Sequence, residues 1–517
     1  MAESKVARSE LYTESPSTLV GWIDYHARRT PTRIAIEQGE TTLTYSDLSL
    51  RIDRLTNILL EHGIQDGARI AVLARNDHRF FEIQYACART GAIMVPLNWR
   101  LSNNELSDII QDFQPKALFH DAHHHETAQH LSHLQNISTI FSWSDQGAGS
   151  YEQAVSQASD LRHEVQTTSD TPWIIIYTSG TTGRPKGVVH TIGSVRANLE
   201  NSMLCGDIDS KTVSLTTLPM FHVAGLHLFS GDVLRAGGRL LIMKAFEAEE
   251  VLQRLWDETI GVTHFSAVPT IYQLMTKTQT YRSATPRPFL AAAGGSPVPT
   301  AIIDTWRDKG ADFIKVYGAS EAGSTVITTS PETKHPESTL AGLHAASVEV
   351  EIRDADGQPI SGNQTGELWI RGQSLMKHYW NRPDATDEAI DESGWYRTGD
   401  AARIDDTGML HIVDRIKDMY ISGGENVYPA EVENTLYTHP AILLVSIIGV
   451  PDEKWGEVGR AFIVLKPQAQ LSAEELRTWC REHMAAYKIP ASFEFVEELP
   501  RNGTGKILKT ALRQARS

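Results

Sequence analysis

Residues 177–191 read YTSGTTGRPKGVVHT, from Tyr177 to Thr191, and directly follow the apolar residues of the run WIIIY, Trp173–Tyr177. The apolar run predicts a buried strand, and the glycines and hydroxyls after it predict a loop. Glycine lets backbone amides approach an anion closely, while hydroxyls and a lysine add donors and positive charge. The stretch therefore predicts a polyphosphate-binding loop with these contacts: Thr178, Ser179, Gly180, Thr181, Thr182 and Lys186.

The same residues are compatible with simpler or different loops. A flexible Gly/Thr turn on the surface is the simpler one, and it would suit a shorter string. The loop also differs from the nucleotide-binding pattern GxxxxGK[ST], because Gly187 follows Lys186 where serine or threonine is required.

Further motifs follow in a fixed order: LPMFHVAGL (Leu218–Leu226), AAGGSPVP (Ala292–Pro299), VYGASEAG (Val316–Gly323), YRTGD (Tyr396–Asp400), DRIKD (Asp414–Asp418), SGGENVYPAEVE (Ser422–Glu433) and PRNGTGKILK (Pro500–Lys509). With the phosphate loop, this series resembles the adenylate-forming superfamily of acyl-CoA synthetases, peptide-synthetase adenylation domains and luciferases. The resemblance covers nearly the whole chain. It is closest in kind to ligases for fatty acids and for 4-coumarate-type acids.

The resemblance implies a nucleotide site. Tyr317 would stack on adenine, Ser320 would contact the α-phosphate where threonine is usual, and Glu321 would hold magnesium. Backbone at Gly295, Ser296 and Gly318 would border the adenine and acyl pockets. Asp400 and Arg415 would hold the ribose hydroxyls, although a pair of this kind in isolation is more often a plain salt bridge.

The resemblance also implies catalytic and moving parts. Lys506 would bridge the substrate carboxylate and the phosphate, and its charge would stabilise the charge that develops in the transition state. His222 would lie near the reacting carboxylate, although a lone histidine among apolar residues is more often a core residue. Lys417 would be the hinge of the C-terminal domain, and Gly423 and Gly424 would lie beside the pantetheine tunnel.

Strand and helix patterns alternate early in the chain, which favours an α/β fold with βαβ units. TTLTY (Thr41–Tyr45) predicts a strand, and Ser46 is expected to cap the next helix. We expect a large N-terminal domain, 1–414, of mixed and parallel sheets layered with helices. Residues 415–517 would form a small mobile α+β domain that carries the catalytic lysine.

The composition of the chain limits which classes of binding partner and which cellular locations are expected. Across 517 residues, 48 basic and 64 acidic residues give a net charge of −16, which argues against a nucleic-acid surface. No apolar run approaches the length of a membrane span. The three cysteines form no CxxC pair and suggest a reducing compartment, so a cytoplasmic location is expected. A homodimer is left open.

Together these observations predict an enzyme, a ligase that forms carbon–sulfur bonds from a carboxylic acid, ATP and coenzyme A with Mg²⁺, through an acyl-adenylate. Alternatives are an adenylating enzyme that loads a separate carrier protein, a luciferase-type oxidase, or a non-catalytic nucleotide-binding protein. The motifs expected to line the acyl pocket contain no cluster of arginines or lysines that could bind a second carboxylate, so a dicarboxylic acid is disfavoured. An apolar monocarboxylic acid larger than acetate is expected, and the choice between fatty, aryl and cinnamate types stays open.

Overall fold

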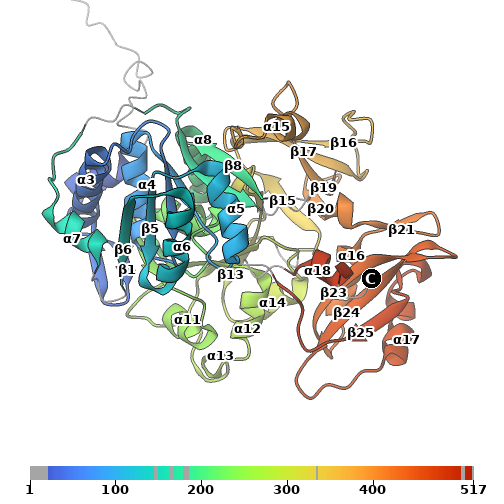
Figure 1. The fold of residues 1–517 in the computed structure, drawn as a ribbon. Helices are drawn as coiled ribbons and strands as arrows, with labels where there is room; N and C mark the ends of the chain where they lie inside the picture. The colour runs from blue at the N-terminus through green and yellow to red at the C-terminus, as the bar shows by residue number, and fades with distance from the viewer. Residues whose placement is uncertain are drawn as a thin grey trace, which may run out of the picture. The chain divides into compact units, whose positions relative to one another are not determined.

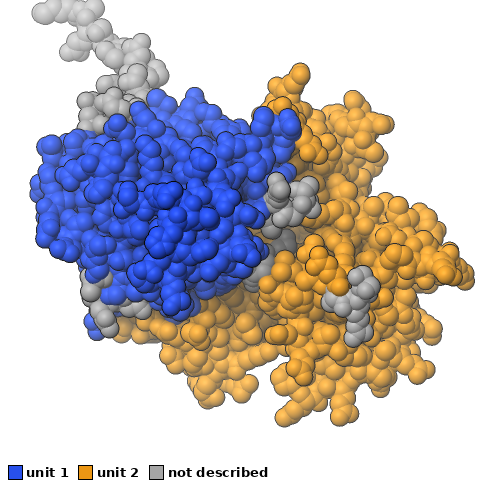
Figure 2. Space-filling model, in the orientation of Figure 1, with its two compact units in different colours: residues 1–245, 373–386 blue, residues 246–372, 387–517 orange. Residues whose placement is uncertain are grey.

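The computed structural model describes residues 21–144, 149–163, 167–178, 185–333, 336–501 and 507–514. The chain forms two compact units, one of residues 1–245 with 373–386 and one of residues 246–372 with 387–517 (Figure 2). The predicted α/β class, with sheets layered by helices, is confirmed. The boundary expected between residues 414 and 415 lies inside the second unit and stays a prediction.

A seven-stranded mixed sheet forms the centre of the first unit. Its order is β18 (His378–Tyr379), β8 (Lys186–Thr191), β7 (Pro172–Thr178), β4 (Ile93–Pro96), β3 (Arg69–Leu73), β5 (Ala117–Asp121) and β6 (Thr139–Trp143). The strands from β7 to β6 are parallel, whereas β8 and β18 are antiparallel to their neighbours. The strand predicted at Trp173–Tyr177 is confirmed as β7, which is one residue longer at each end.

Helices cover both faces of this sheet, because alternate residues of each strand point to opposite sides. Ile70 and Val72 pack in one core with α3 (Tyr45–Glu61) and α4 (Arg79–Thr90). Ala71 and Leu73 pack in another with α5 (Asn103–Phe113) and α6 (His125–Gln135), as Figure 1 shows. The first core also receives α2 (Trp22–Arg29), α7 (Ser150–Gln157) and α8 (Ile192–Cys205).

The start of α3 corrects one prediction. Its N-cap is Thr44, not Ser46, and the helix begins at Tyr45. The Thr44 hydroxyl accepts a hydrogen bond from the Asp47 N–H at 3.1 Å, and the Asp47 carboxylate accepts one from the Thr44 N–H at 3.0 Å. This capping box satisfies two backbone donors at once. Threonine ends the preceding strand as well, which concealed its capping role in the sequence.

The first unit also contains a second strand series: β9 (Val213–Thr216), β10 (Arg239–Ile242), β1 (Ile34–Gln38) and β2 (Thr41–Thr44). Adjacent strands are parallel except for the β1–β2 hairpin. The connection from β9 to β10 contains α9 (Val223–Leu226), a π-helical turn at His227–Gly231 and α10 (Asp232–Ala236). The Leu218–Leu226 motif therefore belongs to a β–loop–helix segment of this unit.

The second unit contains two sheets. The larger series has the order β16 (Val348–Arg353), β17 (Gly366–Gly372), β19 (Tyr396–Ile404), β20 (Leu410–Arg415), β15 (Leu340–His344), β14 (Gly323–Thr328), β13 (Asp312–Ala319), β12 (Leu290–Gly294) and β11 (His264–Ala267). β11, β12 and β13 are parallel, and the pairs from β13 to β16 are antiparallel. The associated helices are α11 (Ala248–Leu255), α12 (Pro269–Met275), α13 (Gln279–Ser283) and α14 (Thr300–Arg307). A further helix, α15 (Pro383–Ala389), crosses the border between the units.

The smaller, five-stranded sheet consists of β22 (Glu425–Val427), β21 (Tyr420–Ser422), β24 (Gly456–Leu465), β23 (Ile442–Asp452) and β25 (Ser492–Phe495). Its core includes residues of α16 (Pro429–Tyr437) and α17 (Ala473–His483), and a second apolar cluster includes Leu512 of α18 (Lys509–Gln514). α16 begins with Pro429, a residue that the first turn of a helix tolerates well. Within the described part of the chain, no helix combines the length and apolar character that crossing a membrane requires.

Candidate active site

A hairpin in the first unit fixes the ends of the predicted phosphate loop. Thr178 ends β7, Lys186 begins β8, and the two residues pair across the antiparallel ladder. The Lys186 ammonium lies 4.9 Å from the centroid of the Tyr379 ring, within cation–π range. The other predicted contacts, Ser179, Gly180, Thr181 and Thr182, lie outside the described residues, so their roles stay predictions.

The base of this hairpin is tightly packed. A Cβ on Gly187 would lie 2.8 Å from a methyl of Ile175, so a larger residue here would require neighbouring side chains to shift. The Tyr177 hydroxyl donates a hydrogen bond to the carboxylate of Asp112 at 2.6 Å, and the Trp380 N–H donates to the Gly187 carbonyl at 2.7 Å. These contacts hold the strands in place below the loop. Asp112 was not predicted, because no motif contains it.

His222 lies immediately before α9 in the loop that follows β9. Burial, and to a lesser extent the positive charge of Arg100, lowers the pKa of His222 to about 4. The imidazole is therefore neutral at pH 7, with one nitrogen that donates and one that accepts. Its Nε2 has no hydrogen-bond partner among the described residues. Because buried polar atoms are normally paired, this nitrogen is a candidate contact for a ligand.

The loop that carries His222 is compact. The His222 N–H donates to the carbonyl of Pro219 at 3.0 Å. A Cβ on Gly225 would lie 2.1 Å from the same carbonyl oxygen, so the approach of α9 to the loop requires glycine. The position of His222 therefore depends on the backbone from residue 218 to residue 220.

Asp400 is the centre of a cluster in the second unit. Its Oδ1 lies 2.6 Å from Nε of Arg415, and its Oδ2 accepts a hydrogen bond from the Tyr317 hydroxyl at 2.6 Å. Asp400 and Arg415 face each other across β19 and β20, whereas Tyr317 comes from β13, 83 residues earlier. The antiparallel part of the sheet thus brings together three residues that had been predicted from separate motifs.

Ionisation within the cluster is well defined. Burial raises the pKa of Tyr317 well above its ordinary value, and the charge of Asp400 raises it further, so the phenol stays protonated and donates. Burial by itself would lower the pKa of Arg415, but the surrounding acidic groups, with Asp400 the largest contributor among them, together raise it. Arg415 therefore remains a cation at all ordinary pH values.

Two residues that were not predicted hold the backbone of Gly399 and Asp400 in place. The Thr398 hydroxyl accepts a hydrogen bond from the Asp400 N–H at 3.0 Å and donates to the carbonyl of Leu368 at 2.7 Å. Glu367 accepts a hydrogen bond from the N–H of Gly399 at 3.2 Å. Thr398 stands inside the motif YRTGD, and its position two residues before Asp400 was a usable signal. Glu367 lies on a neighbouring strand, and no feature of the sequence indicated that it contacts this segment.

Gly295, Ser296 and Gly318 lie at the carboxyl ends of neighbouring parallel strands, since Gly294 pairs with Val316 across β12 and β13. This edge of a parallel sheet is where α/β proteins usually bind ligands. A Cβ on Gly318 would lie 2.4 Å from the Gly323 carbonyl oxygen, so a side chain has no room there.

Ser320 and Glu321 occupy the short turn between β13 and β14. Glu321 offers hard carboxylate oxygens, which Mg²⁺ prefers. No cluster of three or more His, Cys, Asp or Glu side chains suited to a metal occurs in the described residues. A single carboxylate fits Mg²⁺ that is held mainly by water and the phosphates of a nucleotide.

Gly423 and Gly424 form the two-residue turn of the β21–β22 hairpin, with φ values of 62° and 91°. Positive φ at both positions is typical of such turns and favours glycine. The Gly423 N–H donates to the carbonyl of Trp455 at 2.8 Å. Lys417 is exposed in a 3₁₀ turn, Ile416–Asp418, directly after β20. Lys506 lies outside the described residues, and its role stays a prediction.

Comparison with known proteins gives a consistent result. Residues 23–380 match the AMP-binding enzyme family, and residues 431–506 match the AMP-binding enzyme C-terminal domain. Over 499 residues, the chain is 37% identical to a feruloyl-CoA synthase of Amycolatopsis sp., covering 96% of this chain and 98% of that protein. It is 36% identical to a long-chain-fatty-acid–CoA ligase of Mycobacterium tuberculosis over 479 residues, which cover 92% and 93% of the two chains.

Solved structures agree with these matches. An o-succinylbenzoate CoA synthetase from Bacillus subtilis, in complex with its acyl-adenylate intermediate, is 32% identical with a TM-score of 0.83, covering 96% of this chain and 98% of that one. The same synthetase has been solved with ATP and a magnesium ion. The motif series, the Asp400 cluster and a family match over more than half of the sequence lead to one conclusion: the chain belongs to the family of AMP-binding enzymes.

Proposed function

We propose that this enzyme is an ATP-dependent acid–CoA ligase that releases AMP and pyrophosphate. The Asp400 cluster carries the nucleotide part of this proposal, because a carboxylate fixed by Arg415 and Tyr317 is suited to accept hydrogen bonds from ribose hydroxyls. The names of the long, nearly full-length relatives support the acid–CoA ligase part.

In the first step, an oxygen of the substrate carboxylate attacks the α-phosphorus of ATP. The bond from this phosphorus to the bridging oxygen breaks, and pyrophosphate leaves with the electron pair. We propose that Lys506 and the loop from Thr178 to Lys186 stabilise the negative charge, and that His222 donates a hydrogen bond to the acid. Glu321 would hold Mg²⁺, which neutralises phosphate charge when bound. These roles are mostly positioning and charge stabilisation.

In the second step, the thiolate of coenzyme A attacks the acyl carbon and AMP leaves. We propose that the C-terminal residues from 415 turn about Lys417, so that Lys506 is withdrawn and the Gly423–Gly424 hairpin is presented to the pantetheine arm. Two features support this proposal. Lys417 lies in an exposed turn between two strands, and the hairpin tip has no Cβ atoms that would obstruct a narrow channel.

The substrate that we propose is an apolar monocarboxylic acid of the fatty, aryl or cinnamate type. Around His222 lie the rings of Phe221 and, next to that, Trp99, and Val223 follows at the start of α9. The relatives include proteins named for feruloyl, long-chain fatty and indoleacetate substrates. We also propose a cytoplasmic location, since the buried thiols of Cys87 and Cys480 suit a reducing compartment.

The test is pyrophosphate release by the purified enzyme with medium- and long-chain fatty acids, benzoates and cinnamates, each with and without coenzyme A. Mass spectrometry identifies the products. A thioester with AMP supports the proposal and names the substrate class. Pyrophosphate without a thioester would indicate that the acyl acceptor is a carrier protein or oxygen. If no acid in the panel releases pyrophosphate although ATP still binds, the proposed ligase activity is refuted. Lys506→Ala should keep ATP binding and slow pyrophosphate release by about 10²–10³-fold.

A further inference from the structure

Asn76 follows β3 and is buried, with 4% of its surface exposed. Its side-chain amide donates hydrogen bonds to the carbonyls of Leu218, at 2.9 Å, and Met243, at 3.2 Å. Its side-chain oxygen accepts a third bond, from the N–H of Met220 at 2.9 Å. One buried side chain thus binds both ends of a three-residue segment that precedes His222.

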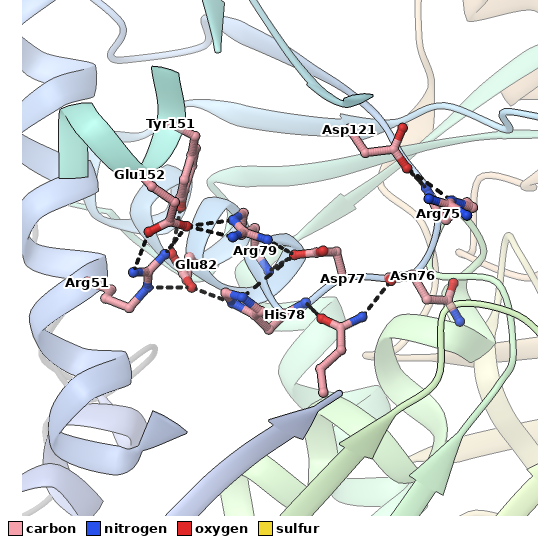
Figure 3. Close-up of polar contacts among 11 residues, drawn as sticks. Arg51, Arg75, Asn76, Asp77, His78, Arg79, Glu82, Asp121, Tyr151 and Glu152 are labelled. Atoms are coloured by element: carbon pink, nitrogen blue, oxygen red, sulfur yellow. Dashed lines mark hydrogen bonds and ion pairs between the residues drawn. The ribbon is translucent and has the colours of Figure 1, made fainter. Parts of the chain in front are cut away.

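The backbone of Asn76 is itself held. The side-chain amide of Gln38, at the end of β1, donates to the Asn76 carbonyl at 2.8 Å. The side-chain oxygen of Gln38 accepts a hydrogen bond from the N–H of His78 at 3.0 Å. Gln38 thus joins Asn76 to His78, and these two residues are labelled in Figure 3. Asn76 can therefore fix the loop because its own peptide is fixed on both sides.

The segment after Asn76 is anchored by buried ion pairs (Figure 3). His78 Nδ1 lies 2.7 Å from the carboxylate of Glu82, which also accepts a hydrogen bond from the Tyr151 hydroxyl at 2.6 Å. Arg51 of α3 lies 2.8 Å from Glu82. Arg79 forms ion pairs with Asp77, at 2.8 Å, and with Glu152 of α7, at 2.7 Å. Because each charge has a partner, this network forms a rigid support.

The loop transmits the constraint over a short path. Leu218 and Met220 are held by Asn76, and the Pro219 carbonyl between them accepts the N–H of His222 at 3.0 Å. Displacing a catalytic contact by about 1 Å can cost about 10²-fold in rate. A change at Asn76 therefore has a direct route to His222 through the backbone of residues 218–220.

We propose that Asn76 is a positioning residue for His222, and that it sets how the acid is held during adenylation. This inference rests on the role given to His222 in the proposed function. It predicts an effect on the acid that is separate from nucleotide binding, since the residues assigned to the nucleotide base and ribose come from other strands.

Asn76→Asp tests this proposal with the smallest change in side-chain shape. It preserves the size of the side chain and an acceptor for the Met220 N–H, but it places an oxygen opposite two carbonyl oxygens that had received hydrogen bonds. We expect kcat/KM for the acid in pyrophosphate release to fall at least about tenfold, with the Kd for ATP changed less than about twofold. Asn76→Ser removes the same bonds without adding a charge, and it should show the same separation if the aspartate variant does not fold.

Asn57 offers a matched control. It is also a buried asparagine, and its side-chain amide donates to the carbonyls of Asp53, Ser159 and Leu161 at 2.8–3.0 Å. None of these belongs to the loop of His222. We expect both Asn57→Asp and Asn76→Asp to lower Tm, because each places a carboxylate oxygen opposite carbonyl oxygens. Asn57→Asp should lower kcat/KM for the acid and for ATP only in proportion to the folded fraction.

Hydrogen exchange of the peptide that contains Met220 tests the inference without any activity. Exchange should be faster than wild type in Asn76→Asp and unchanged in Asn57→Asp. Unchanged exchange in Asn76→Asp, or unchanged kcat/KM for the acid despite faster exchange, would overturn the inference, as would equal losses in both variants. If the wild type forms no acyl-adenylate from any acid, the proposed function fails and the catalytic part of the inference with it, while the exchange result still decides whether Asn76 holds the loop.

Discussion

The Asp400 cluster and the His222 loop differ in how their central side chains are held. Both oxygens of Asp400 are engaged by charged or strongly polar partners, Arg415 and Tyr317. His222 is neutral, lies among aromatic and apolar side chains, and has an Nε2 without a hydrogen-bond partner in the described structure. In the first region the side chains hold one another, whereas in the second the backbone is held and Nε2 of His222 makes no hydrogen bond within the described residues.

This difference fits the two kinds of substrate. A ribose presents the same hydroxyls in every catalytic cycle, so a carboxylate held in one position suits it. A carboxylic acid with a variable apolar body suits an apolar wall with few directed polar contacts. We therefore expect substitutions in the two regions to affect different kinetic parameters.

The largest effect is expected for Asp400→Ala. It removes the carboxylate that we propose binds the ribose, and it leaves Tyr317 and the partly exposed Arg415 without their shared partner. We expect kcat/KM for ATP to fall by about 10²–10³-fold. The matched control is Glu349→Gln, which weakens an exposed cross-strand pair with Arg371, 2.7 Å apart, on β16 and β17. Equal losses in the two variants would mean that Asp400 serves only the sheet.

A smaller effect on a different parameter is expected for His222→Ala. Loss of the imidazole donor should lower kcat for adenylation by roughly 30-fold while the Kd for ATP stays constant. Single-turnover formation of the acyl-adenylate, together with ATP titration, separates these quantities. A large increase in the Kd for ATP would contradict the division between the two regions.

Tyr317→Phe should weaken ATP binding by about tenfold, because it removes one hydrogen bond to a carboxylate and keeps the aromatic ring. Isothermal titration with ATP measures this directly. If the variant loses as much affinity as Asp400→Ala, the tyrosine hydroxyl contributes more than a support for Asp400.

The smallest effect concerns pH. The pKa of His222 is about 4 in the folded protein against an ordinary 6.5, so the unfolded chain binds more protons between these values. Stability linked to His222 is complete above about pH 6.5 and is lost as pH falls toward 4, by at most about 1.4 kcal/mol per pH unit. Urea denaturation from pH 4 to 8 should show a shallower decline in His222→Gln than in the wild type. An identical slope would exclude His222 from this linkage.

Several residues that the structure brings together could be predicted, because each of them lies in a short motif. Gly423 and Gly424 were expected together, and they form one hairpin turn. Asp400, Arg415 and Tyr317 were predicted from three motifs, and the structure places them in contact. The residues that support them could not be predicted in the same way. Glu367 and Asn76 act on segments far away in sequence, and nothing in the neighbouring residues indicates their partners.

The sequence by itself determined the family, the order of the functional motifs and the glycines where backbone comes close, because these depend on residue type and local spacing. Only the tertiary structure decided that Asp400 lies between Arg415 and Tyr317, and that Asn76 holds the loop of His222. The physical reason is that strand order and burial determine which distant groups meet. Those contacts then determine the pKa values and the hydrogen bonds of the residues that we propose take part in the reaction.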